Sequence, residues 1–116
     1  MKSQKTGEYG ELLALEYLEK LGQKLIVKNF RYKRLGEVDI ITNFNNILHF
    51  IEVKTRKNDH YGFPFESVNR KKLEKIIKVA EVFRDQNSLT KLDYQFDIVS
   101  ITLNPTNIEY FENVTL

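Results

Sequence analysis

The sequence contains no cysteine, and only two of its 116 residues are histidine. Without cysteine, the chain has no thiol catalysis, no disulfide framework and no cysteine-ligated zinc. Long apolar runs are also absent, because charged residues interrupt each one before it reaches the length that crosses a bilayer. Residues 1–8 contain no apolar stretch of the kind that a secretory signal needs. We therefore expect a cytoplasmic protein that does not span a membrane.

The formal net charge of +2 is too small to indicate a nucleic-acid partner, but the charges are unevenly distributed. Between Lys24 and Arg34 there are five basic residues and no acidic one. Any single basic cluster fits an ordinary solvated surface. Three clusters around one acidic motif favour a surface that contacts phosphate. The other two clusters are Lys54, Arg56 and Lys57, and Arg70, Lys71, Lys72, Lys75 and Lys78.

The length and a hydrophobic content of 41% predict one domain, residues 1–116, with a core of its own. Leucines at helical spacing predict a first helix over residues 10–21, with Gly22 as its terminator. Asn69 is the expected N-cap of a second helix that runs to Phe83. The pattern predicts an α/β fold, a mixed β-sheet flanked by two helices. The expected strands are residues 24–33, 37–42, 47–55, 94–103 and 108–111.

Two strands of this sheet carry the residues of chemical interest. Side chains alternate along a strand, so Glu52 and Lys54 share one face. A hairpin tip at residues 44–45 would set Asp39 opposite Phe50 and diagonal to Glu52. Moving the register by one residue on each side of the loop would set Asp39 directly opposite Glu52. Both registers bring two carboxylates and an ammonium group together.

Carboxylates on adjacent strands repel each other and raise each other's pKa unless a cation lies between them. The possible ligands are oxygens, and His49 falls on the other strand face, so the pattern favours Mg²⁺ or Mn²⁺ over zinc. Such an ion would polarise a phosphodiester, and Lys54 would orient water or balance charge. The alternative is an ordinary ion pair between Lys54 and Glu52 or Asp39 in a half-exposed sheet.

The spacing from Asp39 to Glu52-Val53-Lys54 resembles the signature of the PD-(D/E)xK nuclease superfamily. Further motifs, spread over nearly the whole chain, resemble the bacterial YraN or UPF0102 family of endonuclease-like proteins. His49 departs from that pattern, since the family usually carries an aliphatic residue there. The motifs are Gly7-x-x-Gly10-Glu11-x-x-Ala14, Asn29-x-Arg31, Gly36-Glu37-Val38-Asp39-Ile40-Ile41, Phe50-Ile51-Glu52-Val53-Lys54-Thr55-Arg56, Tyr61-Gly62, Lys72 and Phe96-Asp97-Ile98-Val99.

The resemblance implies a restriction-endonuclease-like core and a hydrolytic nuclease site for DNA or structured nucleic acid. The family is similar to archaeal Holliday-junction resolvases, which place an acid on the first helix near the metal, and Glu11 stands at that position. Asp39 and Glu52 would be the other acidic ligands, the Val53 carbonyl would be a further one, and Lys54 would stabilise charge. Because the related resolvases pair their sites, the resemblance also implies a homodimer.

Further residues are candidates for contacts with nucleic acid. Arg31, Arg56 and Lys72 would contact phosphate, and Tyr61 would stack on an unpaired base. Each also fits a bland interpretation, as a solvated basic residue or as an aromatic side chain that packs its loop. Glu37 fits either a role beside the metal or one in the turn, and the role of Asp97 stays open.

The leading hypothesis is therefore a Mg²⁺- or Mn²⁺-dependent endodeoxyribonuclease with Glu11, Asp39, Glu52 and Lys54 as its catalytic residues. A nucleic-acid-binding module on the same fold that does not cleave is the first rival. A protein-interaction domain that uses the exposed sheet edge at residues 108–111 is the second rival.

Overall fold

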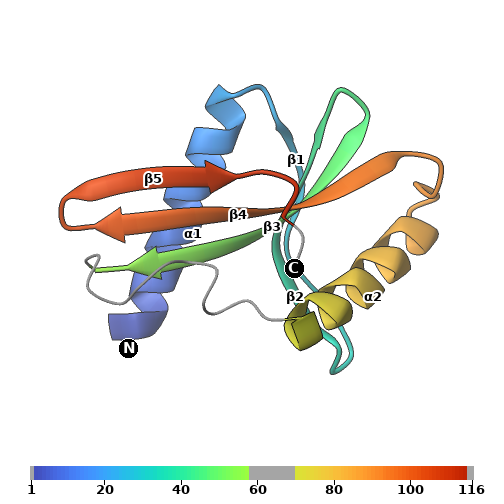
Figure 1. Ribbon diagram of the computed structural model, residues 1–116, viewed down its shortest axis with the longest axis horizontal. Helices are drawn as coiled ribbons and strands as arrows, with labels where there is room; N and C mark the ends of the chain where they lie inside the picture. Colours follow the sequence, from blue (N-terminus) through green and yellow to red (C-terminus); the bar gives the residue numbers. More distant parts are fainter. Residues whose placement is uncertain (1, 58–69, 115–116) are drawn as a thin grey trace.

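The computed structural model describes residues 2–57 and 70–114, and it has the predicted order of helices and strands (Figure 1). The first helix begins well before the predicted residue 10, whereas the strands lie close to their predicted positions. The N-cap expected at Asn69 lies outside the described residues. The elements are α1 (Lys2–Lys20), β1 (Lys24–Tyr32), β2 (Gly36–Phe44), β3 (Ile47–Arg56), α2 (Arg70–Gln86), β4 (Asp93–Leu103) and β5 (Thr106–Phe111).

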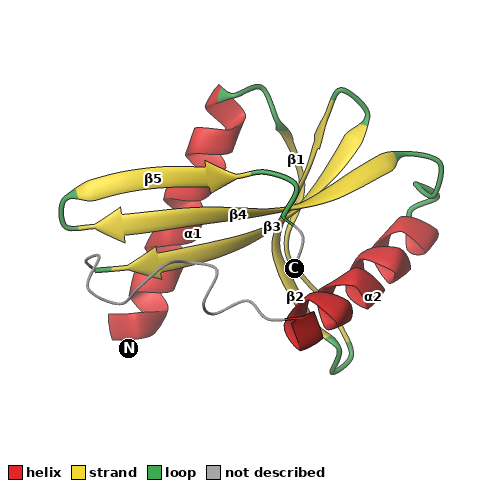
Figure 2. Ribbon diagram, viewed as in Figure 1, coloured by secondary structure: helices red, strands yellow, loops and turns green. Residues whose placement is uncertain are grey.

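The five strands form one mixed sheet in the order β1-β2-β3-β4-β5 (Figure 2). β3 and β4 are parallel, and every other neighbouring pair is antiparallel. Parallel neighbours need a crossover, and α2 lies in the connection between these two strands. The α/β fold with a mixed sheet and two helices is therefore confirmed.

The two helices cover opposite faces of the sheet (Figure 1). Ala14 and Leu18 of α1 are fully buried in a cluster with residues of β2, β3 and β4. Phe83 of α2 lies in the second cluster, where its ring meets Phe30 at 5.1 Å and Phe50 at 6.1 Å between centroids. Because β3 lies between the helices, its alternate side chains supply both clusters.

The first helix ends as the sequence predicts, at a glycine. Gly22 has φ = 96°, a left-handed conformation that costs little without a Cβ atom. Its amide donates to the Glu19 carbonyl at 3.0 Å, and the Gln23 amide donates to the Leu18 carbonyl at 3.1 Å. These two bonds form a Schellman motif, which satisfies the last carbonyls of α1 and turns the chain into β1.

The β2–β3 hairpin decides between the two predicted registers. Its pairs run from Phe44↔Ile47 to Ile40↔Ile51, which is the second register. The first register, with its tip at residues 44–45, is wrong. The tip consists of Asn45 and Asn46, both left-handed with φ of 53° and 63°, and two such residues suit a tight hairpin turn. Continuing this register sets Asp39 opposite Glu52.

Candidate metal and nucleic-acid site

Asp39 lies on β2 just beyond the last regular pair of the hairpin. Its carboxylate oxygen Oδ2 accepts a hydrogen bond from the backbone amide of Val53 at 2.8 Å. The side chain of Asp39 therefore reaches across to β3 between Glu52 and Lys54. This bond fixes the carboxylate against the strand that carries the other two residues of the motif.

The surroundings of Asp39 disfavour its negative charge. Burial raises the pKa of Asp39 most, and the nearby charges of Glu52, Glu11 and Glu37 raise it further, to about 7. The hydrogen bond from the Val53 amide works in the opposite direction. Three carboxylates, on α1, β2 and β3, therefore lie close enough to Asp39 for their charges to raise its pKa, and Glu52 is the one that the sequence predicts there.

Glu52 is held by two lysines. Its oxygen Oε1 lies 3.3 Å from Lys54 Nζ and accepts a hydrogen bond from Lys72 Nζ of α2 at 3.0 Å. Burial lowers the pKa of Lys54, and the neighbouring Lys72 lowers it too, against the opposing charge of Glu52. The ion pair of the alternative interpretation is thus present, and it lies within the acidic cluster.

Glu11 is brought to the sheet by a close approach of α1 to β3. A Cβ atom on Gly10 would lie 1.8 Å from Thr55 Oγ1, so any residue other than glycine there would have to displace Thr55 or α1. The next residue, Glu11, accepts a hydrogen bond from Asn29 Nδ2 of β1 at 3.0 Å. Glu11, the acid that the resemblance implies, thus lies close enough to Asp39 for its charge to raise the pKa of Asp39, although it comes from α1 and not from the sheet.

The donor set of this site fits a hard divalent cation, because it consists of carboxylate oxygens. The oxygens are nevertheless spread out. Within residues 2–57 and 70–114, His, Asp and Glu ligand atoms come within 4.8 Å of one another in one group of three, and that group is His49, Asp97 and Glu112. An ion bound by Glu11, Asp39 and Glu52 would therefore have to draw their carboxylates together and compete with two lysines for Glu52.

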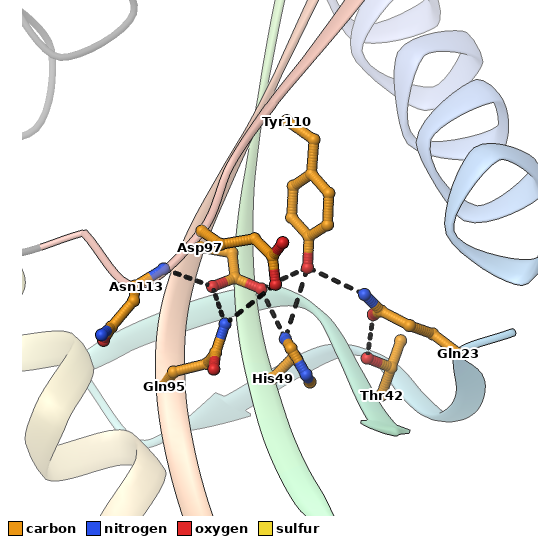
Figure 3. Close-up of polar contacts among 8 residues, drawn as sticks. Gln23, Thr42, His49, Gln95, Asp97, Tyr110 and Asn113 are labelled. Carbon is orange, nitrogen blue, oxygen red and sulfur yellow. Dashed lines mark hydrogen bonds and ion pairs between the residues drawn. The ribbon is translucent and has the colours of Figure 1, made fainter. Parts of the chain in front are cut away.

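The group of His49, Asp97 and Glu112 lies on the face of the sheet that α1 covers, and its hydrogen bonds explain it without an ion (Figure 3). Asp97 is 2% exposed and accepts four hydrogen bonds. The donors are Tyr110 Oη, His49 Nδ1 at 2.6 Å, Gln95 Nε2 at 2.9 Å and the Asn113 amide at 2.9 Å. These bonds outweigh burial and keep the pKa of Asp97 below its usual value. Both oxygens are saturated, so Asp97 has a structural role.

This network continues through Gln23, which donates to the Tyr110 hydroxyl at 2.8 Å and accepts from the Thr42 hydroxyl. Sequence reasoning missed it, although it placed His49 correctly on the face away from Asp39. One signal was available: Asp97 interrupts an apolar strand, and a charge inside such a strand needs a buried partner. The partner's identity depends on which strands are neighbours, and the sequence pattern leaves that open.

The candidate nucleic-acid contacts are placed differently from one another. Lys72 reaches the acidic cluster, whereas Arg31 is exposed on β1 opposite Glu37. Arg56 ends β3, and its buried Nε and Nη1 atoms find no hydrogen-bond partner in the described part of the chain. Tyr61 lies outside the described residues. Among the three candidates within the described residues, Lys72 is the one whose hydrogen bond with an acid of the site is established.

Neither α1 nor α2, the two helices described, has the length and apolar character needed to cross a membrane.

Comparison with known proteins gives a consistent result. The family model described as "Uncharacterised protein family UPF0102" matches residues 10–101. The UPF0102 protein of Clostridioides difficile (strain 630) is 38% identical over 113 residues, which cover 97% of this chain and 98% of that protein. The UPF0102 protein of Sulfurihydrogenibium sp. (strain YO3AOP1) is 41% identical over 112 residues, 97% of this chain and 94% of that protein.

A third relative, the UPF0102 protein of Caldanaerobacter subterraneus, is 39% identical over 102 residues, which cover 88% of this chain and 83% of that protein. The matched segment contains Glu11, Asp39, Glu52 and Lys54. With a match to the family model over most of its length and relatives at about 40% identity that it covers over most of their own length, this chain belongs to the UPF0102 (YraN) family.

Proposed function

We propose that this protein is a metal-dependent endonuclease that hydrolyses phosphodiester bonds in DNA or structured nucleic acid, with Mg²⁺ or Mn²⁺ as its cofactor. One observation carries the proposal. Folding buries Asp39 and brings Glu52 and Glu11 near enough for their charges to act on it, and together these effects raise the pKa of Asp39 to about 7. Such an arrangement is unfavourable without a cation, and a divalent ion would relieve it.

The residues of the site fit defined tasks. A divalent ion, when bound, supplies a Lewis acid and a water of lowered pKa. Asp39, Glu52 and Glu11 would hold it, with the Val53 carbonyl as a further ligand. Lys54 lies beside Glu52, and its pKa is lowered by burial and by Lys72. An ammonium group there would stabilise the charge that develops on the scissile phosphate.

Titration calorimetry of Mn²⁺ into the wild type and Asp39→Asn tests the metal site. Glu109 is an exposed carboxylate on the edge strand β5, so Glu109→Gln is the matched control. We expect binding in the wild type and the control, and its loss in Asp39→Asn. No binding of Mn²⁺ by the wild type would refute a metal-dependent site.

Cleavage of labelled branched, single-stranded and duplex DNA by the same samples tests the activity. Glu52→Gln and Lys54→Ala should each lower the cleavage rate by about 100-fold or more, since each removes a group that acts on developing charge. Lys91→Ala removes an exposed lysine between α2 and β4 and should cleave normally. Unchanged cleavage in both site variants would contradict the proposal.

A second candidate function is a nucleic-acid-binding module that does not cleave. It is favoured by the two lysine contacts of Glu52 and by the spread of the acidic side chains at the site. In that case Glu52 would orient Lys54 and Lys72 toward a phosphate. Binding would then weaken steeply with salt and need no divalent ion, whereas the nuclease needs the ion for turnover.

The proposal includes a homodimer, because cutting both strands of a duplex takes two sites. Sedimentation velocity at micromolar concentration, with and without branched DNA, measures the state directly. A monomer under both conditions would remove this part of the proposal and leave the site itself unaffected.

A further inference from the structure

Strand β1 changes the face it presents at Asn29. Val27 and Phe30 both pack against the hydrophobic cluster that contains Phe83 of α2. Strict alternation would put residues 27 and 30 on opposite faces of the sheet. Between them Asn29 has φ = 54°, in the left-handed region. On β2, Ile41 and Val38 pair with these two residues and also face the same cluster. Both strands therefore shift their facing at this level.

The shift lies at the level of the acidic site. The pairs Lys28↔Ile40 and Phe30↔Val38 flank Asn29, so the same register places Asn29 opposite Asp39. The amide Nδ2 of Asn29 donates to Glu11 Oε1 at 3.0 Å. Asn29 is thus a neighbour of one acid through the sheet and is bonded to another acid on α1.

The chemistry of the amide suits this position. A lysine at residue 29 would neutralise Glu11 and compete with a cation, as Lys54 and Lys72 do at Glu52. An uncharged amide orients the carboxylate and leaves its full negative charge available. Ligands of metal ions are commonly held in this way by a hydrogen bond from a residue that does not itself touch the metal.

We propose that Asn29 is a positioning residue that holds Glu11 at the acidic site, and that its left-handed backbone is what aims its amide at α1. This inference rests on the proposed metal site and goes beyond it, since Asn29 lies outside the ligand set. A left-handed residue other than glycine inside a strand is strained, and such strain persists where the surroundings or the function require it.

Asn29→Gly separates the two roles of the residue, because glycine accepts φ = 54° without strain but has no amide side chain. The matched control is Asn46→Gly, which changes the same residue type at φ = 63° in the exposed β2–β3 turn. Calorimetry should give about tenfold weaker Mn²⁺ binding for Asn29→Gly and no change for Asn46→Gly. Urea denaturation without metal should show both variants folded, with midpoints near that of the wild type or above it.

The double variant Asn29→Gly/Glu11→Gln tests whether Asn29 acts through Glu11. Glu11→Gln alone should weaken Mn²⁺ binding, and adding Asn29→Gly should then weaken it no further. If Asn29→Gly weakens Mn²⁺ binding by the same factor in the wild type and in Glu11→Gln, the inference is overturned, even if Asn29→Gly is poorly folded. An Asn29→Gly variant that binds Mn²⁺ as tightly as the wild type does would also overturn it. A wild type that binds no Mn²⁺ would instead show that the proposed function fails, and this inference with it.

Discussion

The contact between Gly10 and Thr55 predicts opposite effects for two substitutions in the same helix. A Cβ atom on Gly10 would lie 1.8 Å from Thr55 Oγ1 and 2.8 Å from both Thr55 Cβ and Cγ2, whereas one on Gly7 meets nothing within 4 Å. Contacts below 3.0 Å require atoms to move, and those of Thr55 belong to a short, half-buried side chain on β3. Ala14, on the next turn, is fully buried against the sheet, so α1 has little freedom to retreat.

The magnitudes follow from two effects. Replacing glycine by alanine inside a helix stabilises it by roughly 0.5–1 kcal/mol, and this gain applies to both Gly7 and Gly10. Overpacking at Gly10 costs about 1–3 kcal/mol. We therefore expect Gly7→Ala to stabilise the protein and Gly10→Ala to destabilise it, with the two variants about 1–3 kcal/mol apart. At this chain length, each kcal/mol corresponds to a difference of roughly 4 °C in Tm.

The free energies of unfolding come from urea denaturation, with calorimetric Tm as a second measure. Thr55→Ala removes Oγ1 and Cγ2, so Gly10→Ala should cost less in that background than in the wild type. Gly10→Ala that is as stable as Gly7→Ala would refute the reasoning. It would mean that α1 slides on the sheet at little cost, and Glu11 would then not be held by this contact.

Two further predictions concern buried carboxylates. The pKa of Asp39 is raised from 3.8 to about 7 in the folded protein. Between these two pH values the folded protein without metal keeps a proton that the unfolded chain has lost. The free energy of unfolding therefore falls as the pH rises from about 4 to 7. Asp39→Asn should therefore be more stable than the wild type in metal-free urea denaturation at pH 8, by at most about 4 kcal/mol, and equal stability there would contradict it. The pKa of Asp97 is lowered instead, so its contribution is present above pH 4 and is lost as the pH falls below that value. Asp97→Ala leaves buried donors such as His49 and Tyr110 without their acceptor and should lower the free energy of unfolding at pH 7 by about 3 kcal/mol, whereas a change below 1 kcal/mol would refute the structural role of the network.

The sequence predicts the elements well because each has a local signal. The leucine spacing marks α1, and Gly22 marks its end through a conformation that glycine adopts easily. The common facing of Glu52 and Lys54 follows from strand alternation alone. The sequence alone allows two registers of the β2–β3 hairpin, because Phe44-Asn45 and Asn45-Asn46 are both acceptable turn sequences.

The features that the sequence did not predict depend on contacts between distant segments. The sequence predicts a contact of Lys72 with phosphate. Its contact with Glu52 depends on how α2 crosses β3, which the sequence does not show. Asp97 contacts His49 because β3 and β4 are neighbours in the sheet. In the sequence these two strands are separated by the whole of α2. The hydrogen bond from Asn29 to Glu11 is not predictable either, since strand alternation does not place a side chain at a residue where the alternation breaks.

The single parallel pair in the sheet has a consequence for how the protein folds. β2 and β3 are joined by a two-residue turn, so this hairpin closes a short loop and we expect it to form early. Pairing of β3 with β4 has to wait for α2, because it closes a loop of more than thirty residues. The hairpin therefore brings Asp39 and Glu52 together before α2 delivers Lys72, and their repulsion opposes the early step. Divalent cations or acid should speed refolding, whereas they should have little effect on a chain with Asp39→Asn.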